Sequence, residues 1–489
     1  MNKYNGLSAI GCILVLFVVL NACSQPVEKE EQNTARIIIS GLTEDDASNA
    51  RIFSVNIFSM VDSTLAKIEQ GSDTLGLLID KPTLAIITIG ENRQTLYLEN
   101  DYDLNISVKK AQGTRRLYFE GKGSQQNNYL AGVAHLRDSI LNLEGKNIMQ
   151  VGLEEFTERI SDLEKVLENY FLKNTKRFEF PDEQYDLFNK LNTLTLAAYK
   201  ENYFFNYPSI NNAEVPSSFY IENDIPSDPI YITYNVPEFG MLMMLYMYNR
   251  LITPIVSNRS PDSWDTIKHE AVTLIEKKIS AQKHPHEIEE FLKAKNVQHW
   301  MTNAGLDSSV LKAYDNFNKT YPASDYSRFL AVQYEKLMTL SKGNEAPEIK
   351  GLTIKGKWDS LSNYKGKIVY VDVWATWCGP CIKEFPYSQQ LNERFEGSSN
   401  FIILYVSIDR DTEAWKKMVL DKTDVLKGVH INHKEGEVEP PISEPYQIAG
   451  VPRYILIDEN GKIVDADAKR PSSPVLAEQI ERLLTKGNG

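Results

Sequence analysis

The spacing of apolar and polar residues divides most of the chain into three stretches of different character. Between residues 34 and 123, short runs rich in Ile, Val, Tyr, Phe and Thr alternate with polar or Gly-containing segments, which is typical of β-strands. The clearest runs are ARIIISGL, ARIFSVNIFS, TLAIITI, TLYLENDYDLNISV and RLYFEG. Strands at this spacing predict a β-rich N-terminal domain over 34–123, built as a small β-sandwich.

From 124 to 342 the apolar residues follow the period of amphipathic helices instead. The segment 153–171 shows this best, because one stripe carries its apolar residues Phe156, Ile160, Leu163, Val166 and Leu167. Similar segments recur near 125–145, 182–203, 237–257, 262–280, 286–297 and 324–341. A stretch rich in Pro, Ser and Asn at 207–229 predicts a long loop. The middle of the chain is therefore expected to be an α-helical region.

The last stretch, 343–489, combines strands with helices and is expected to form a separate α/β domain. SKGNEAPEIKG ends the preceding helix and opens this domain. GKIVYVDVWATWCGPCIKEFP then predicts a buried strand over 368–374, a short loop and a helix starting at Cys378. A chain of 489 residues has room for several domains of ~150 residues each, so a multidomain fold is expected.

The pattern of residues at the N-terminus predicts an export signal. Lys3 precedes an apolar run from Ile10 to Leu20, which is shorter than the ~20 residues of a membrane span, so residues 1–22 predict a secretory signal peptide. The sequence Leu20-Asn21-Ala22-Cys23 resembles the bacterial lipobox. An ordinary signal peptide, or a buried apolar segment with an incidental Cys, is the alternative.

If the lipobox is used, Cys23 carries the lipid and begins the mature chain. The polar residues that follow it then form a tether over 23–33. We expect a protein of the cell envelope that is anchored by lipid to the inner or outer membrane and faces the periplasm.

Cysteine usage points to redox chemistry. The chain has four cysteines: Cys12 leaves with the signal peptide and Cys23 carries lipid, which leaves Cys378 and Cys381. An exported protein usually uses cysteines as structural disulfides, yet only one closely spaced pair is available here. With no second Cys pair in the sequence, we expect no zinc or other metal site.

The expected position of this pair at the start of a helix gives each cysteine a different task. The unpaired N–H groups and partial positive charge of a helix N-terminus stabilise a thiolate and lower the pKa of Cys378. Cys381 lies one helical turn later and can reach back to close a disulfide. Cys378 is therefore the predicted attacking residue, and Cys381 the residue that resolves the mixed disulfide.

Composition excludes one class of partner. The net charge is −13, with 53 basic and 66 acidic residues, whereas nucleic acid binding requires a basic surface. The apolar segment FGMLMMLYMY at 239–248 is too short to span a bilayer and predicts a buried helix.

The C-terminal stretch resembles the exported, membrane-tethered thiol–disulfide oxidoreductases of the TlpA/ResA kind, within the AhpC/TSA-redoxin-related part of the thioredoxin superfamily. The resemblance covers 343–487 and rests on NEAPEIKG, KGKIVYVDVWATWCGPC, ILYVSIDRDTEAWKK and YQIAGVPRYILIDENGKIV. It implies a thioredoxin-like fold. LYLENDYDLNISV with GKGSQQNNYL loosely resembles a β-rich module of unknown function that precedes such domains in exported lipoproteins of Bacteroidetes-type bacteria.

The resemblance also implies roles for individual residues. Pro452 matches the family's cis-proline, and the backbone of Val451 before it faces substrate. Trp377 matches a residue that shields the disulfide face, and Gly379 and Pro380 fill the space between the cysteines. These five residues are the expected substrate-binding set.

Two acidic residues are further candidates for the catalytic set. Asp372 matches the buried acid of thioredoxin; between Val371 and Val373 it would be desolvated, with a raised pKa suited to taking a proton from Cys381. Glu384 matches an acidic residue near the active site of the ResA kind. An exposed helix position is the alternative for Glu384.

The function expected from the resemblance is reduction of disulfides in exported client proteins, with no cofactor beyond the Cys378–Cys381 disulfide. Electrons would come from a membrane donor of the DsbD or CcdA type. One alternative is a client-binding or scaffold lipoprotein with an accessory redox domain. Another is a thiol peroxidase, which is disfavoured because Ala375 and Val371 occupy the Thr and Pro positions of the peroxidase motif.

Overall fold

The structure is a computed structural model that describes residues 34–43, 50–60, 62–68, 73–90, 92–111, 114–211, 225–256, 264–434, 438–448 and 450–486. The predicted signal peptide 1–22, the lipidation site Cys23 and the tether 23–33 lie outside the described residues. Within these ranges, no helix combines the length and the apolar character that a membrane crossing requires.

The N-terminal region is the predicted β-sandwich. Two four-stranded sheets have the orders β4-β1-β7-β8 and β3-β2-β5-β6, and apolar side chains of both join one buried cluster. The strands are β1 (Thr34–Ser40), β2 (Arg51–Val55), β3 (Asp62–Lys67), β4 (Asp73–Leu78), β5 (Thr83–Ile89), β6 (Asn92–Leu98), β7 (Asp103–Ala111) and β8 (Thr114–Lys122).

Sequence reasoning missed β3 and β4, because each lies at the edge of its sheet. β3 has the sequence DSTLAK, and most of its residues are exposed. Edge strands of this kind bury little apolar surface, so they lack the hydrophobic alternation that marks an interior strand.

The middle region is helical, as predicted. Its helices are α2 (Ser124–Leu141), α3 (Leu153–Phe178), α4 (Asp182–Asn211), α6 (Ile230–Thr233), α7 (Pro237–Tyr246), α8 (Thr253–Val256), α9 (Trp264–Ala281), α10 (His286–Ala304), α11 (Ser308–Thr320) and α12 (Asp325–Thr339), with short turns η1 (Leu143–Gly145) and η2 (Ile148–Gln150) and a π-helical turn η3 (Met247–Ile252). The loop predicted from residue 207 is wrong at its start, because α4 continues through Pro208 to Asn211. The helix α11 lies outside the segments predicted to be helical.

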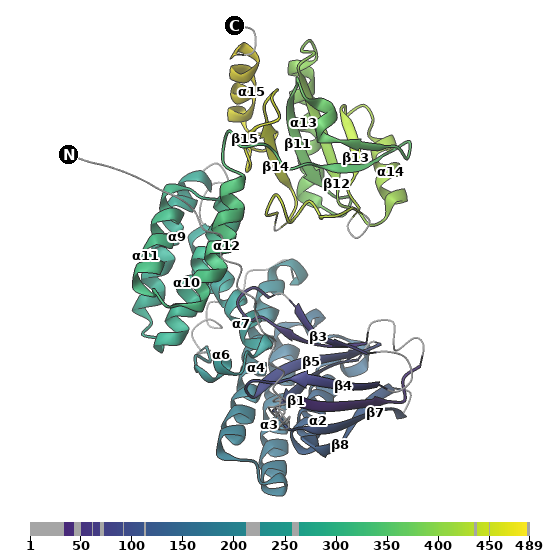
Figure 1. The fold of residues 1–489 in the computed structure, drawn as a ribbon, viewed down its shortest axis with the longest axis vertical. Coiled ribbons are helices and arrows are strands. Elements are labelled where there is room, and N and C mark those ends of the chain that lie inside the picture. The colour runs from purple at the N-terminus through teal and green to yellow at the C-terminus, as the bar shows by residue number, and fades with distance from the viewer. Residues whose placement is uncertain are drawn as a thin grey trace, which may run out of the picture.

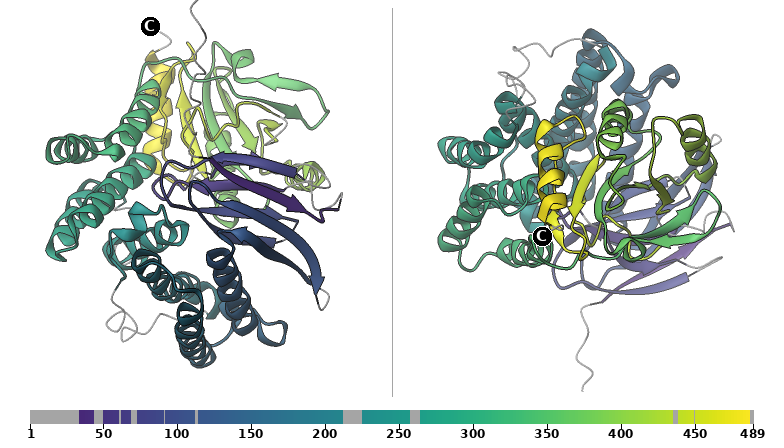
Figure 2. Two further views of the ribbon diagram at one scale, coloured as in Figure 1. Left: turned by 60° about the horizontal axis from the view of Figure 1, so that its bottom comes forward. Right: turned by 90° about the horizontal axis from the view of Figure 1, so that it is seen from above.

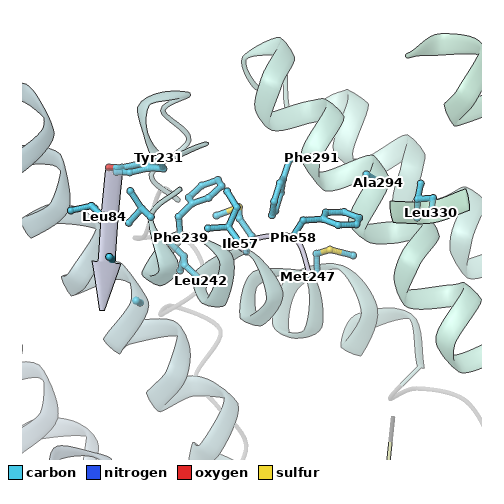
Figure 3. Close-up of a cluster of buried hydrophobic side chains, with 14 of the residues drawn as sticks. Ile57, Phe58, Leu84, Tyr231, Phe239, Leu242, Met247, Phe291, Ala294 and Leu330 are labelled. Carbon is cyan, nitrogen blue, oxygen red and sulfur yellow. The ribbon is translucent and has the colours of Figure 1, made fainter. Parts of the chain in front are cut away.

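The sandwich and the helices share one hydrophobic core. The turn after β2 places Phe58 beside Phe291 of α10 (Figure 3). On its other side the ring of Phe58 contacts Tyr326 and Phe329 of α12. Lys295 on α10 donates to the carbonyl of Phe58. The boundary expected between 123 and 124 therefore separates two kinds of secondary structure that pack as a continuous unit.

The C-terminal region has a seven-stranded mixed sheet of order β10-β9-β13-β12-β11-β14-β15. Its elements are β9 (Lys350–Thr353), β10 (Trp358–Ser360), η5 (Leu361–Tyr364), β11 (Ile368–Trp374), α13 (Gly379–Phe395), β12 (Phe401–Ser407), α14 (Thr412–Asp421), β13 (Val429–Asn432), β14 (Arg453–Ile457), β15 (Ile463–Asp465) and α15 (Pro474–Lys486). β11 pairs in parallel with β12 and antiparallel with β14. This arrangement is the predicted thioredoxin-like α/β fold.

The C-terminal domain follows directly from α12 and lies at one end of the molecule's long axis (Figure 1). Its helix α15 is on the side nearest to α9–α12, as the views in Figure 2 agree. Lys336 on α12 lies 3.7 Å from the carboxylate of Glu444, and the Tyr446 hydroxyl donates to the carbonyl of Pro347. The first contact connects the helical region with the loop that leads into β14, and the second connects that loop with the segment that opens the C-terminal domain.

Candidate active site

The two cysteines lie where the buried strand β11 gives way to α13. All seven residues of β11 are buried, and its hydrogen-bonded neighbours on both sides fix its position. Cys378 is the N-cap of α13, and its Sγ accepts the N–H of Cys381 at 3.2 Å. The two residues form a disulfide with their Cα atoms 5.3 Å apart. In the first turn of the helix, the N–H of Cys381 thus points at the sulfur of Cys378.

The disulfide is buried, while the residues around it in sequence are exposed. Cys378 and Cys381 are 3% and 2% exposed, but Gly379 and Pro380 between them face solvent. Trp377 is 68% exposed. The indole therefore offers apolar surface to solvent next to Cys378.

Val451 and Pro452 lie at the same end of the sheet as the cysteines. The peptide bond between them is cis. The next residue, Arg453, pairs with Val373 near the end of β11, so the Val451–Pro452 bond lies beside the loop that leads to Cys378. Val451 packs against the buried cluster that contains both cysteines.

Asp372 is a carboxyl group buried inside the domain. It lies on β11 between Val371 and Val373, is 1% exposed, and its Oδ1 has no hydrogen-bond partner among the described residues. Burial, together with the nearby charge of Glu384, raises the pKa of Asp372 from 3.8 to about 8. Asp372 can therefore hold or release a proton near neutral pH.

Glu384 is buried, so the alternative of an exposed helix residue is wrong. It lies on α13 and is 8% exposed. Its carboxylate accepts the backbone N–H of Ser472 at 3.0 Å and the Ser472 hydroxyl at 3.1 Å. The pair joins the active-site helix to the segment before α15.

Sequence reasoning missed Asp409, which holds the active-site loop. Its carboxylate accepts the N–H of Thr376 at 3.0 and 3.1 Å, the Thr376 hydroxyl at 2.7 Å and the Ser407 hydroxyl at 2.8 Å. Asp409 follows β12 just as Thr376 follows β11, and these strands are parallel neighbours. Polar residues directly after adjacent parallel strands meet at one sheet edge, and this signal was available in the sequence.

The C-terminal region of the chain is similar to known proteins that carry redox domains. A family model described as Redoxin matches residues 341–480. Thiol-disulfide oxidoreductase ResA of Bacillus cereus is 30% identical over 151 residues, which cover 31% of this chain and 83% of that protein. A second ResA, from another strain of the species, is 33% identical over 145 residues and 77% of its length. The chain belongs to the ResA-like thiol–disulfide oxidoreductases of the thioredoxin superfamily.

One solved structure, a putative thiol-disulfide oxidoreductase from Bacteroides vulgatus, is 32% identical to the chain. It matches with a TM-score of 0.27 and covers 30% of this chain and 98% of that one. All these matches account for about a third of the ResA-like chain or less.

Two histidines near this sheet form hydrogen bonds with other residues of the same chain. His430 stacks on Tyr405 with ring centroids 4.7 Å apart and bonds the carbonyl of Leu426. His433 bonds the carbonyl of Lys350 through Nδ1 and accepts the N–H of Ile442 at Nε2. Within the residues that the structure describes, no group of three or more His, Cys, Asp or Glu side chains is placed to hold a metal ion.

Proposed function

We propose that this protein is an exported, lipid-anchored reductase of disulfides in client proteins of the cell envelope, with Cys23 as the lipidated residue. The observation that carries the proposal is the Cys378–Cys381 disulfide at the N-terminus of α13, with exposed residues around it. The relatives named ResA support this reaction class. No cofactor beyond the cysteine pair is needed for it.

In the proposed reaction, the Cys378 thiolate attacks one sulfur of the client disulfide and forms a mixed disulfide, and the other client sulfur leaves as a thiolate. Cys381 then attacks Sγ of Cys378 and releases the second client sulfur. Two electrons pass to the client, which becomes a dithiol, while the protein pair becomes a disulfide. Asp372 is proposed to take the proton from Cys381 as that residue attacks.

Continued turnover needs an electron source outside the cytosol. We propose a membrane donor of the DsbD or CcdA type that reduces the Cys378–Cys381 disulfide by the same exchange chemistry. The Gly-Pro dipeptide between the cysteines is the one found in thioredoxin, whose potential is about −270 mV, whereas the oxidant DsbA lies near −120 mV.

The first test is the reduction potential of the cysteine pair, measured by Trp fluorescence in a dithiothreitol redox buffer. A value of about −250 mV or lower supports a reductase. A value near −120 mV would reverse the direction of electron flow and contradict the proposal.

The second test traps the client. Cys381→Ser should accumulate mixed disulfides with envelope proteins through Cys378, whereas the matched Cys378→Ser variant should not. Non-reducing gels and mass spectrometry of the captured proteins provide the measurement. Equal trapping by both variants would show that Cys378 is not the attacking residue.

A further inference from the structure

A cavity of about 510 Å³ lies far along the chain from the cysteines, between the β3–β2–β5–β6 sheet and the helices α2, α4 and α7. Val55 and Ile86 line it from the sheet, and Leu130, Leu191 and Met241 line it from the helices. Its volume falls within the range of small-ligand sites. None of its lining residues belongs to the C-terminal domain, so it is separate from the active site.

The lining also contains polar side chains with atoms that form no hydrogen bond to the described part of the protein. Gln94 and Glu238 both line the cavity; the Nε2 atom of the first and the Oε2 atom of the second have no hydrogen-bond partner among the described residues. A buried donor or acceptor left unpaired destabilises the folded chain, and a ligand that pairs with it removes that cost. One is a donor and the other an acceptor, and a peptide group supplies the complement of both.

Among the described residues, two charged groups of the lining have no ion-pair partner, the carboxylate of Glu238 and the guanidinium of Arg93. Asp62 in its lining forms an ion pair with Arg51 at 2.8 Å, and Arg137 forms one with Asp138 at 2.9 Å. The exposed Arg93, by contrast, lies 5.5 Å from the ring centroid of Phe53 and has no carboxylate partner in the described part of the chain. Arg93 is therefore available to a carboxylate of a bound molecule.

We propose that this cavity binds a short extended segment of the client protein, with apolar side chains and one carboxylate that pairs with Arg93. The identification of the partner as a client rests on the proposed function. A peptide is favoured over a hydrocarbon chain because the unpaired amide of Gln94 and carboxylate of Glu238 line the cavity, and an acyl chain would desolvate these groups without bonding them.

The test uses the mature full chain in detergent and a mixture of fluorescein-labelled pentapeptides. Each peptide has a central Glu and Leu, Ile, Met, Val or Phe elsewhere, and a second mixture has Gln at the centre. Fluorescence anisotropy should show saturable binding of the Glu mixture. Arg93→Gln should weaken that binding about tenfold and leave the Gln mixture unaffected. Arg116→Gln, which removes a positive charge from the other sheet, is the matched control and should change neither.

A second variant tests the cavity volume. Ala134→Phe places a ring in the cavity from α2 and should weaken binding of both mixtures. Thermal unfolding checks that this variant is folded, and Arg93→Gln tests the proposal without changing the core. Absence of saturable binding, equal effects of Arg93→Gln and Arg116→Gln, or full binding by a folded Ala134→Phe would each overturn the cavity assignment.

Reduction of insulin disulfides by the same preparation separates the two proposals. Normal reduction without peptide binding would overturn the cavity inference and leave the proposed function intact. Failure to reduce disulfides would overturn the proposed function, and with it the identification of the bound segment as a client.

Discussion

Two groups of Thr376 donate hydrogen bonds to Asp409, and these bonds hold the loop immediately before Cys378. Both the backbone N–H and the hydroxyl of Thr376 donate to the carboxylate, which is 2% exposed and also accepts from Ser407. A loop held by a buried carboxylate keeps the sulfur of Cys378 in one position. Asp409 is thus a positioning residue.

Replacing Asp409 should therefore lower the rate of disulfide reduction by more than the accompanying loss of folding stability can account for. Asp409→Ala leaves three donors without their acceptor, so the free energy of unfolding should fall by at least the ~1–3 kcal/mol that one unpaired buried donor costs. The rate of insulin reduction should fall at least about tenfold because Cys378 is less well placed. Asp411→Ala is the control: Asp411 caps α14 through the N–H groups of Glu413 and Ala414, and its loss should cost about 1 kcal/mol with an unchanged rate. Equal rate losses in both variants would show that Asp409 acts only through stability.

The buried carboxyl of Asp372 should make stability depend on pH. Its folded-state pKa, raised to about 8 mainly by burial, exceeds the ordinary value of 3.8. Between these values the folded state keeps a proton that the unfolded chain releases, so stability falls as pH rises from about 4 to about 8 and levels off above.

Asp372→Asn removes this titration. The variant should match the parent near pH 4 and exceed its free energy of unfolding by at least about 1 kcal/mol at pH 8, as measured by urea unfolding at several pH values. Asp421→Asn, at the exposed end of α14, is the control and should show no such growing difference. A difference that stays constant with pH would contradict the assignment.

Glu384 and Ser472 should be energetically coupled. Ser472→Ala removes the hydroxyl bond and keeps the backbone N–H bond, while Glu384→Gln removes the charged acceptor of both, so a double-mutant cycle should give a coupling of about 1 kcal/mol. Ser473→Ala is the control that should not couple to Glu384. Additive losses in the first cycle would mean that the contact does not contribute.

The same substitution should act on Asp372. The charge of Glu384 is the second cause that raises the pKa of Asp372, after burial. Glu384→Gln should therefore shift the pH at which stability levels off to a lower value. An unchanged pH profile would show that the two carboxyl groups do not interact.

Phe58 should be essential for joining the sandwich to the helices. Its ring is 1% exposed and contacts three aromatic rings, so Phe58→Ala should reduce the free energy of unfolding by about 3–5 kcal/mol in urea. Phe205 is 50% exposed, and Phe205→Ala is expected to cost less than about 1 kcal/mol. Similar losses in the two variants would contradict the insertion of Phe58 into a shared core.

The sequence by itself determined the features that depend on local pattern. The apolar run Ile368–Trp374 followed by Cys378 and Cys381 predicts strand, loop and helix, because a buried strand and a helix start each have a signature within a few residues. The change from strand-like to helical period near residue 124 separated the sandwich from the helices for the same reason.

The tertiary structure alone decided the features that depend on residues distant in sequence. It brought Ser472 to Glu384, 88 positions away, and Phe58 to Phe291, and it opened the cavity between sheet and helices. The edge strand β3 is another feature that the tertiary structure decided. Its residues are mostly exposed and show no alternation of apolar and polar side chains, so it is recognised as a strand only by its pairing with β2. Hydrophobic periodicity reports which face of an element is buried, whereas the partner of that face is selected by packing of the whole chain.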